Sequence, residues 1–272
     1  MIFRILVVFL IAFGATAAQA KSPRPAALDE GRVDLPGLRA ETDRMRTEAG
    51  FAPAATAGPT EAEVGDVDSF GKTKIYLGVV QTKPLFVTSD CTGSDPASEV
   101  CVETNPAPAP TVIDEANVGT MVLPGKSSNS ILCFTFTQFS TYFWSNSSAG
   151  PQTARMEVWP TVQIENSVLD GLVNANGVPF NGALFEEPIP ILVNTSQGAL
   201  SPGESELHRE RFTRSCTGGL VNARALRAEG LTDAQIKDFF DEPMNITIGY
   251  GGQTAGVDDA IFFHGIRIYG DD

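Results

Sequence analysis

The stretch SILCFTFTQFSTYFW, residues Ser130–Trp144, carries the densest β-strand pattern in the chain. Its aromatic and β-branched residues favour strands, and a strand sends alternate side chains to opposite faces of its sheet. One face takes Phe134, Phe136, Gln138, Ser140, Tyr142 and Trp144, and the other takes Cys133, Thr135, Thr137, Phe139, Thr141 and Phe143. Either face can form a core. The stretch therefore predicts a central strand or hairpin of an all-β protein.

Similar short apolar runs, separated by turn residues, lie on both sides of this stretch. They are Lys74–Gln81, Leu85–Thr88, Thr120–Leu123, Ala154–Ile164, Ile189–Val193, Glu206–Cys216, Asn245–Tyr250 and Ala260–Tyr269. Many short strands with almost no long helical pattern between them are typical of sandwiches. We predict an all-β fold, an antiparallel β-sandwich of jelly-roll or immunoglobulin-like type, with one or two short inserted helices.

The inserted helices are predicted between the last strands. Thr232 and Gln235 have the spacing of a capping box, which marks a helix start. The apolar residues that follow share one helix face: Ile236, Phe239 and Phe240. A second small helix is predicted over Leu220–Ala228.

The first twenty residues have the pattern of a secretory signal peptide. A positive start at Met1–Arg4 is followed by the apolar run Ile5–Phe13 and by the small-x-small site Ala18–Ala20. The run is shorter than the roughly 20 apolar residues that a membrane span needs. We therefore expect residues 1–20 to be removed and the protein to be soluble and exported, to the periplasm or to the medium.

Two further segments follow the signal peptide. Residues 21–65 are rich in Ala, Pro and charged residues, so we expect a flexible tail. Within it, Leu38–Glu48 alternates Arg with acidic residues and predicts a short charged helix, which we interpret as a solvated spacer rather than a partner-docking helix. Residues 66–272 are predicted to form a single β-sandwich domain.

The chain has four cysteines, and in an oxidising compartment an even number is read first as disulfides. Four cysteines allow three connectivities. We favour Cys91 with Cys101, which flank a loop rich in Gly, Ser, Asp and Pro, and Cys133 with Cys216. These bonds are interpreted as structural.

Charge and residue types narrow the function. Nineteen Lys and Arg stand against 33 Asp and Glu, a net charge of -14, which disfavours nucleic acid and anionic membrane surfaces as partners. The two histidines lie in no nucleophile or zinc motif, so the sequence favours a non-catalytic protein. A polysaccharide hydrolase that uses a carboxylate pair, for instance among Glu157, Glu165 and Glu186, stays open.

Acidic residues at the two ends of the predicted sandwich suggest a calcium site. Asp66 and Asp68 precede the first strand, and Asp258 and Asp259 precede the last. Calcium takes about six to eight oxygen ligands, and these four carboxylates suit it if they converge. The run from Val257 through Tyr269 also resembles the closing strand of calcium-binding jelly-roll modules that recognise carbohydrates. That resemblance implies calcium and a glycan ligand.

The conspicuous aromatic residues and the two histidines can be interpreted either as binding residues or as structural ones. Tyr142 and Trp144 can form a stacking platform for a sugar ring, although the excess of Phe over Trp and Tyr favours their use in the core. His264 is predicted to be a core or rim residue, because period two places it beside Phe262 and Ile266. His208 lies on a strand with charges on both faces, which is typical of an edge strand.

The sequence thus yields ordered hypotheses. The first is an exported, non-catalytic β-sandwich that acts as a structural or interaction module at the cell envelope or outside it, with an envelope protein or a polysaccharide as partner. The alternative is a calcium-linked carbohydrate-binding module, and the second alternative is the hydrolase. A further option is that the tail adds a strand to a neighbouring copy.

Overall fold

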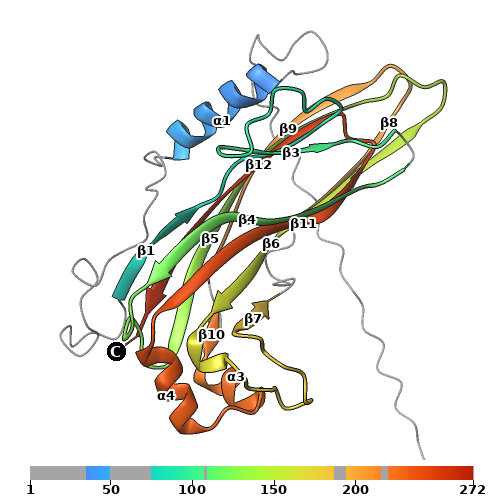
Figure 1. Cartoon of the computed structure of the whole chain (residues 1–272). Coiled ribbons are helices and arrows are strands. Elements are labelled where there is room, and N and C mark those ends of the chain that lie inside the picture. Colours follow the sequence, from blue (N-terminus) through green and yellow to red (C-terminus); the bar gives the residue numbers. More distant parts are fainter. Residues whose placement is uncertain (1–34, 50–74, 107–108, 187–193, 216–219, 272) are drawn as a thin grey trace, which may run out of the picture. The chain divides into compact units, whose positions relative to one another are not determined.

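The computed structural model describes residues 35–49, 75–106, 109–186, 194–215 and 220–271 (Figure 1). The predicted signal peptide, most of the predicted tail, the strand at Ile189–Val193, Asp66, Asp68 and Cys216 lie outside these residues. None of the helices in the described part combines the length and apolarity needed to cross a membrane.

The described chain forms two β-sheets that face each other. The seven-stranded sheet has the order β10-β5-β12-β2-β3, with β1 paired to β12 and β9 paired to β5. The five-stranded sheet has the order β4-β11-β6-β7, with β8 paired to β6. Every pairing is antiparallel except β2 with β3, which is parallel. The predicted all-β sandwich with short helices is confirmed.

The bounds of the elements are as follows. The seven-stranded sheet contains β1 (Ile75–Gln81), β2 (Leu85–Thr88), β3 (Val100–Glu103), β5 (Ile131–Ser145), β9 (Ser205–Ser215), β10 (Val221–Asn222) and β12 (Asp259–Gly270). The five-stranded sheet contains β4 (Thr111–Leu123), β6 (Gln152–Glu165), β7 (Ala183–Glu186), β8 (Asn194–Leu200) and β11 (Met244–Ala255). The helices are α1 (Leu35–Ala49), the 3-10 helix η3 (Ser167–Leu169), α3 (Ala223–Ala228) and α4 (Asp233–Asp241).

The main core lies between the sheets. The inward face of β5 contributes its buried aromatic side chains, namely Phe134, Phe136, Tyr142 and Trp144. They pack with inward residues of β6 and β11, among them Val158, Ile164, Ile248 and Tyr250. His264 is fully buried beside the rings of Phe136 and Tyr250, and its Nε2 lies 3.0 Å from the side-chain oxygen of Gln138. The period-two placement of His264 in the core is correct.

The capping box and both small helices are also present. At the start of α4 the Thr232 side chain accepts a hydrogen bond from the backbone N–H of Gln235. The side-chain oxygen of Gln235 in turn accepts one from the backbone N–H of Thr232. Asn222 caps α3 with one such bond, which its side chain accepts from the amide of Ala225. Ile236, Phe239 and Phe240 are buried, as their spacing predicts.

Several strands differ from the prediction: β3, β7 and β10 were not predicted, and β10 replaces the start of the helix expected at Leu220–Ala228. β4 begins at Thr111, nine residues before the predicted run, and its first half carries Asp114 and Glu115. β8 is built from Asn194–Leu200, which is mostly polar. Both strands lie in the five-stranded sheet, whose outer face tolerates polar side chains, so an apolar run was not needed there.

Helix α1 corrects the expectation of a solvated spacer within a flexible tail. Leu35, Leu38, Thr42 and Met45 recur on one side of the helix and all are buried. This side packs on the outer face of the seven-stranded sheet, where Met45 contacts Thr141 and the Arg46 guanidinium lies over the Phe263 ring. The charged residues dominate the composition of α1, and they concealed this apolar side.

Candidate functional site

A pocket of about 580 Å³ opens where the end of the five-stranded sheet meets η3 and the turn before β11. Its lining mixes polar and apolar residues: Gln163, Glu165, Asn166, Ser167, Asp170, Asn181, Gly182, Glu242 and Asn245, together with Val122, Ala183, Pro243 and Met244. Three carboxylates and no Lys or Arg occur among these described residues. The pocket is therefore acidic, with several amide groups able to donate and accept hydrogen bonds.

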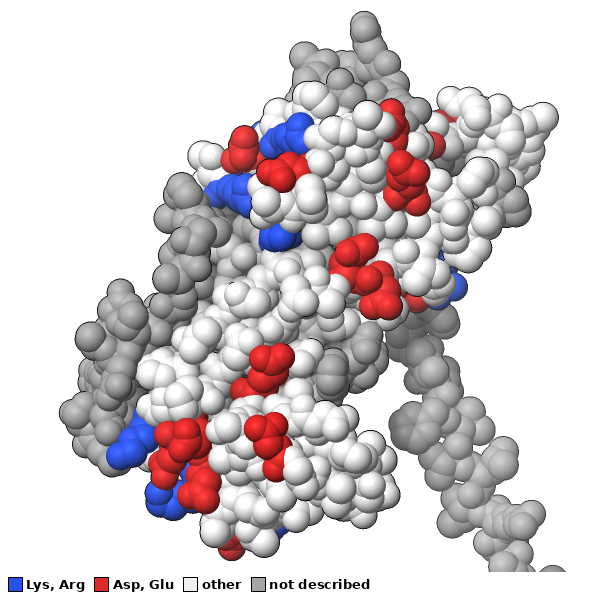
Figure 2. Space-filling view, viewed as in Figure 1, with Lys and Arg blue, Asp and Glu red and all other residues white. Residues whose placement is uncertain are grey.

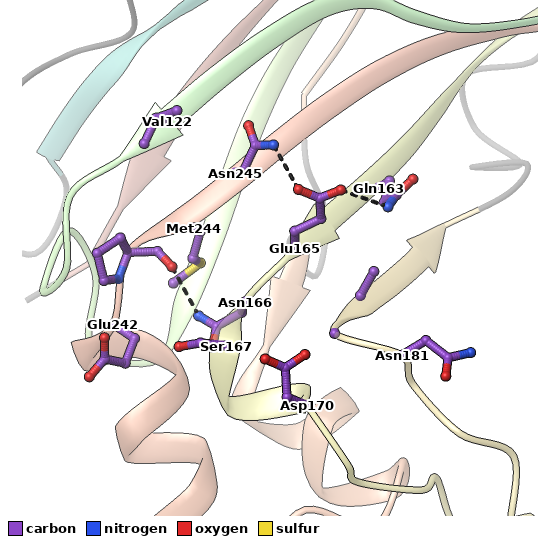
Figure 3. Close-up of a pocket in the computed structure, with 13 residues that line it drawn as sticks. Val122, Gln163, Glu165, Asn166, Ser167, Asp170, Asn181, Glu242, Met244 and Asn245 are labelled. Carbon is purple, nitrogen blue, oxygen red and sulfur yellow. Dashed lines mark hydrogen bonds between the residues drawn. The ribbon is translucent and has the colours of Figure 1, made fainter.

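Glu165 links the two central strands at the mouth of the pocket. Its carboxylate accepts a hydrogen bond from Asn245 of β11 at 2.8 Å and one from Gln163 of β6 at 3.1 Å (Figure 3). The β6–β11 register places Glu165 opposite Asn245, so backbone pairing brings these groups together. A carboxylate has about four acceptor sites, so the group keeps capacity for a ligand.

The floor of the pocket is held by Asn166 and Gly182. The buried Asn166 side chain donates to the carbonyl of Phe239 at 2.8 Å and accepts from the amide of Val168, which ties η3 to the end of α4. Gly182 has a φ of +81° and lies against Asp170, where an added Cβ would come within 2.6 Å of the carboxylate. A side chain at position 182 would therefore displace Asp170.

From the pocket, a row of outward-facing side chains runs along β6 and β11. We call it the β6–β11 strip and define it by Glu157, Trp159, Thr161, Gln163 and Glu165 of β6 and Asn245, Thr247, Gly249, Gly251 and Gln253 of β11. The register pairs these residues directly, Glu165 with Asn245 and Glu157 with Gln253 at the two ends. Its side chains are mostly half-buried, because each lies against its neighbour across the pair.

Trp159 is the aromatic residue of the strip. It pairs with Gly251, and a Cβ at position 251 would lie 2.4 Å from the indole nitrogen. The indole therefore occupies the space that a side chain at 251 would take. Its Nε1 is buried and has no hydrogen-bond partner among the described residues, so the part of the half-buried ring that reaches solvent is apolar.

The far end of the strip repeats the arrangement at the pocket. Glu157 accepts hydrogen bonds from Gln253 at 2.8 Å and from Arg155 at 2.6 Å. The bond from Gln253, followed by the one from Arg155, lowers the pKa of Glu157. Glu157 therefore stays ionised at neutral pH.

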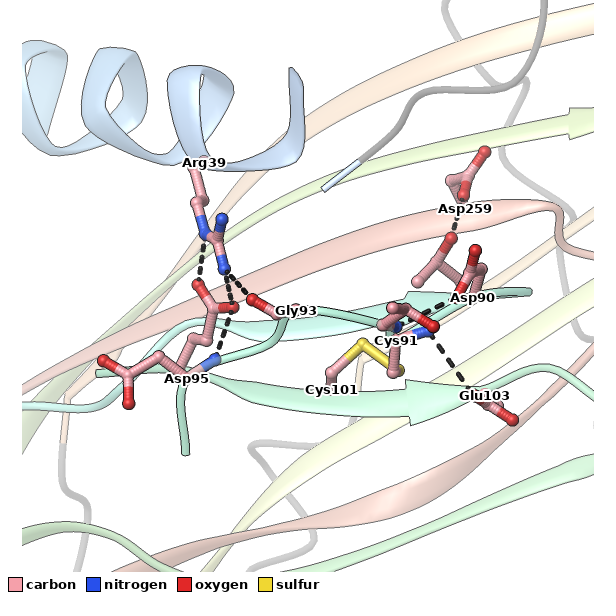
Figure 4. The surroundings of a disulfide bond; sticks show 11 residues. Arg39, Asp90, Cys91, Gly93, Asp95, Cys101, Glu103 and Asp259 are labelled. Atoms are coloured by element: carbon pink, nitrogen blue, oxygen red, sulfur yellow. Dashed lines mark hydrogen bonds and ion pairs between the residues drawn. A yellow bond between two sulfur atoms is a disulfide. The ribbon is translucent and has the colours of Figure 1, made fainter. Parts of the chain in front are cut away.

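The opposite outer face, on the seven-stranded sheet, combines buried apolar side chains with polar ones such as Thr141 and Arg209, and α1 packs on part of it. Besides its apolar side, α1 makes two polar anchors. Arg39 donates to both oxygens of Glu99 and to the carbonyl of Gly93, in the loop closed by Cys91 and Cys101 (Figure 4). Glu41 is buried, accepts from Arg44 and from Arg209 of β9, and lies 3.2 Å from the Thr141 hydroxyl.

Of the predicted disulfides, Cys91–Cys101 is present. Cys133 is also disulfide-bonded, but its expected partner Cys216 lies outside the described residues. The pairing of Cys133 with Cys216 therefore stays a prediction.

Tyr142 and Trp144 lie in the core, each about 1% exposed, so they form no platform for a sugar. Tyr142 hydrogen-bonds Ser196 and Glu210, and Trp144 donates to Glu206 at 3.3 Å. The ring of His208, on β9, stacks on Tyr142 at a centroid distance of 5.0 Å. β9 is an edge strand within the described part of the sheet, as its charges predict. Alternation correctly placed Tyr142 and Trp144 on one face of β5, and the packing of the two sheets makes that face part of the core.

The predicted calcium ligands are not brought together in the described residues. Asp259 is buried and accepts a hydrogen bond from Thr88 at 2.7 Å. Burial raises the pKa of Asp258, although Ser145 hydrogen-bonds its carboxylate. No group of three or more His, Cys, Asp or Glu side chains in the described ranges is arranged to hold a metal. Asp66 and Asp68 lie outside those ranges, so a calcium site with them stays a prediction.

Of the three carboxylates considered for a hydrolase, Glu157 and Glu165 lie far apart. Glu157 and Glu165 lie eight residues apart on β6, about 27 Å along an extended strand. Paired glycosidase carboxyls lie within about 10 Å of each other. This pair is therefore excluded, and the side chain of Glu186 lies outside the described residues.

No protein-family model and no curated protein matches the chain. The site must be interpreted from its own residues. Sequence reasoning missed Trp159, Gln163 and Asn245, although the alternation in Ala154–Ile164 placed the first two on one face. The register between β6 and β11, which brings Asn245 to that face, had no signal in the sequence.

Proposed function

We propose that the protein is an exported, non-catalytic interaction module that binds its partner on the outer face of the five-stranded sheet. Export is supported by the signal-peptide pattern of residues 1–20 and by the disulfides. The partner belongs to the cell envelope or its surroundings, as a polysaccharide or a protein.

The difference between the two outer faces carries this proposal. The outer face of the seven-stranded sheet is already occupied by α1 through apolar and charged contacts. The outer face of the five-stranded sheet carries a pocket, exposed Val112 and Val122, and polar groups with spare hydrogen-bonding capacity. A concave site with convergent polar groups is the usual place for a ligand.

The proposal is tested by blocking the face with one bulky charge. Thr161 lies in the middle of the strip, where its hydroxyl is 2.4 Å from the position of a Cβ on Gly249. Thr161→Arg would place a long side chain over the face. Ala97→Arg, at an exposed position in the Cys91–Cys101 loop, is the matched control.

The measurement is retention of each purified protein on cell envelopes of the source organism and on a panel of insoluble polysaccharides. We expect the wild type and Ala97→Arg to be retained and Thr161→Arg to be lost. Equal retention of all three proteins, or of none, contradicts the proposal. Parallel columns with calcium and with a chelator test the calcium-linked alternative, because calcium-dependent retention would support it.

A further inference from the structure

We infer that the β6–β11 strip binds an uncharged polysaccharide chain, with Trp159 stacking on a sugar ring and the amide–carboxylate groups at both ends hydrogen-bonding hydroxyls. This inference rests on the proposed function, because it names the ligand of the same face. The sugar-stacking residue is then Trp159, on the outer face of the five-stranded sheet, rather than Tyr142 or Trp144, which are buried.

The orientation of Trp159 is the first argument. Its N–H edge points into the protein and its ring rests on Gly251, so the ring is held in place and presents hydrocarbon to solvent. Sugar rings have faces of C–H groups that pack well on such a surface, whereas their hydroxyls point outward. A fixed ring loses little conformational freedom on binding, which favours affinity.

The hydrogen-bonding groups are the second argument. A sugar hydroxyl both donates and accepts, and the strip offers both functions side by side. Glu165 with Gln163 and Asn245 forms one such group, and Glu157 with Gln253 forms the other. In each group the carboxylate is already oriented by an amide.

The shape of the strip indicates a chain rather than a single sugar. Glu157 and Glu165 are about 27 Å apart along β6, and Trp159 stands between them. Gly249 and Gly251 carry no side chain, so Thr161 and Trp159 lie over the β11 backbone and no side chain of β11 rises between them. An extended ligand can therefore lie along the strands and contact both ends.

Charge excludes acidic polymers. Within β6 and β11, Arg155 is the one cation, and it is paired with Glu157. Asp114 and Glu115 of β4 add negative charge next to Gly251 and Tyr250, and burial, with help from Asp114, raises the pKa of Glu115. In Figure 2 acidic side chains are spread across the visible face, whereas the basic ones lie at its upper left, its lower left and its right edge. A phosphate or uronate chain would be repelled.

The test compares neutral, anionic and cationic polysaccharides as ligands for the wild type, Trp159→Ala, Trp159→Phe and Ala97→Arg. We expect retention on at least one neutral polymer and weak binding of anionic ones. Trp159→Ala should weaken binding by about tenfold or more, and Trp159→Phe should keep most of it, because an aromatic face remains. Ala97→Arg should bind like the wild type.

Melting temperatures of the variants control for folding, and Trp159→Phe keeps the test valid if Trp159→Ala is unstable. The inference is overturned if no neutral polymer is retained, if only cationic polymers are retained, or if Trp159→Ala binds as well as the wild type. If Thr161→Arg abolishes retention on envelopes while no polysaccharide binds, the proposed function stands with a protein partner and the glycan inference fails.

Discussion

The two outer faces of the sandwich are built from similar strands, but one is packed against a helix and the other is exposed. The outer face of the seven-stranded sheet carries Phe139, Phe143, Ile261 and Phe263, all buried, and α1 packs on it. On the outer face of the five-stranded sheet, β6 and β11 present mostly polar side chains and Trp159, β4 adds the exposed Val112 and Val122, and no helix in the described ranges covers it (Figure 1). The difference shows that the side-chain chemistry of the second face decides whether a sheet gains a further layer or stays available to a ligand.

The largest expected effect comes from the disulfide on the covered side. The Cys91–Cys101 bond closes the loop that holds Gly93 and Glu99, the two anchors of Arg39. Replacing both cysteines by alanine should lower the free energy of unfolding by about 3 kcal/mol, because the unfolded chain regains loop entropy. Urea unfolding measures the loss. Unchanged stability would mean that the loop is held by its other contacts.

A buried side chain of α1 should have the next largest effect. Leu38 is 3% exposed, and Leu38→Ala should cost about 2 kcal/mol through lost burial and a residual cavity. Cleavage by a protease within α1 should also become faster, since the helix is released more often. If cleavage and unfolding are both unchanged, α1 does not stabilise the covered face.

Acid should loosen α1 through Glu41. Burial by itself would raise the pKa of Glu41, but hydrogen bonds from Arg44 and Arg209 outweigh it and hold the pKa below its usual value. The stabilisation is therefore fully present above the unfolded pKa of about 4.3 and is lost as pH falls through the lower folded pKa. Glu99 behaves alike, because the hydrogen bond from Arg39 lowers its pKa. Cleavage of α1 by an acid-active protease should accelerate below about pH 4.

Glu41→Gln is the control for that pH effect. It removes the titrating group, so part of the acid dependence of α1 release should disappear while cleavage at neutral pH becomes faster. The core adds a second pH effect, because burial lowers the pKa of His264 to about 3. As pH falls below about 6.5 the unfolded chain takes up this proton first, so acid also lowers the stability of the whole fold. Identical pH profiles for Glu41→Gln and the wild type would contradict the role of Glu41.

The smallest effect is expected on the face that stays open. Val122 is 53% exposed on the outer side of β4, and Val122→Ala should change the free energy of unfolding by less than about 0.5 kcal/mol. Compared with Leu38→Ala, this substitution measures how differently the two faces depend on their apolar side chains. A loss as large as that of Leu38→Ala would mean that another part of the chain covers Val122.

The sequence predicted the elements better than their environment. Period two identified β5, β6 and β12, and the capping box placed the start of α4, because both signals act over a few neighbouring residues. The sequence also placed Cys91 and Cys101 together across a short loop. The helix predicted at Leu38–Glu48 is present within α1, but its environment was wrong, since the charges that interleave along it do not show which side meets a sheet whose first strand begins 26 residues after the helix ends.

The site was decided by tertiary structure. Glu165 and Asn245 lie 80 residues apart in the chain and meet because β6 and β11 pair in one register. Tyr142 lies in the core because the second sheet covers it, whereas Trp159 has the same chemical capacity and lies outside. Alternation assigns each side chain of a strand to one of two faces, because the backbone of that strand alone fixes it. Which face is buried depends on contacts between distant segments, and those form only when the sheets pack.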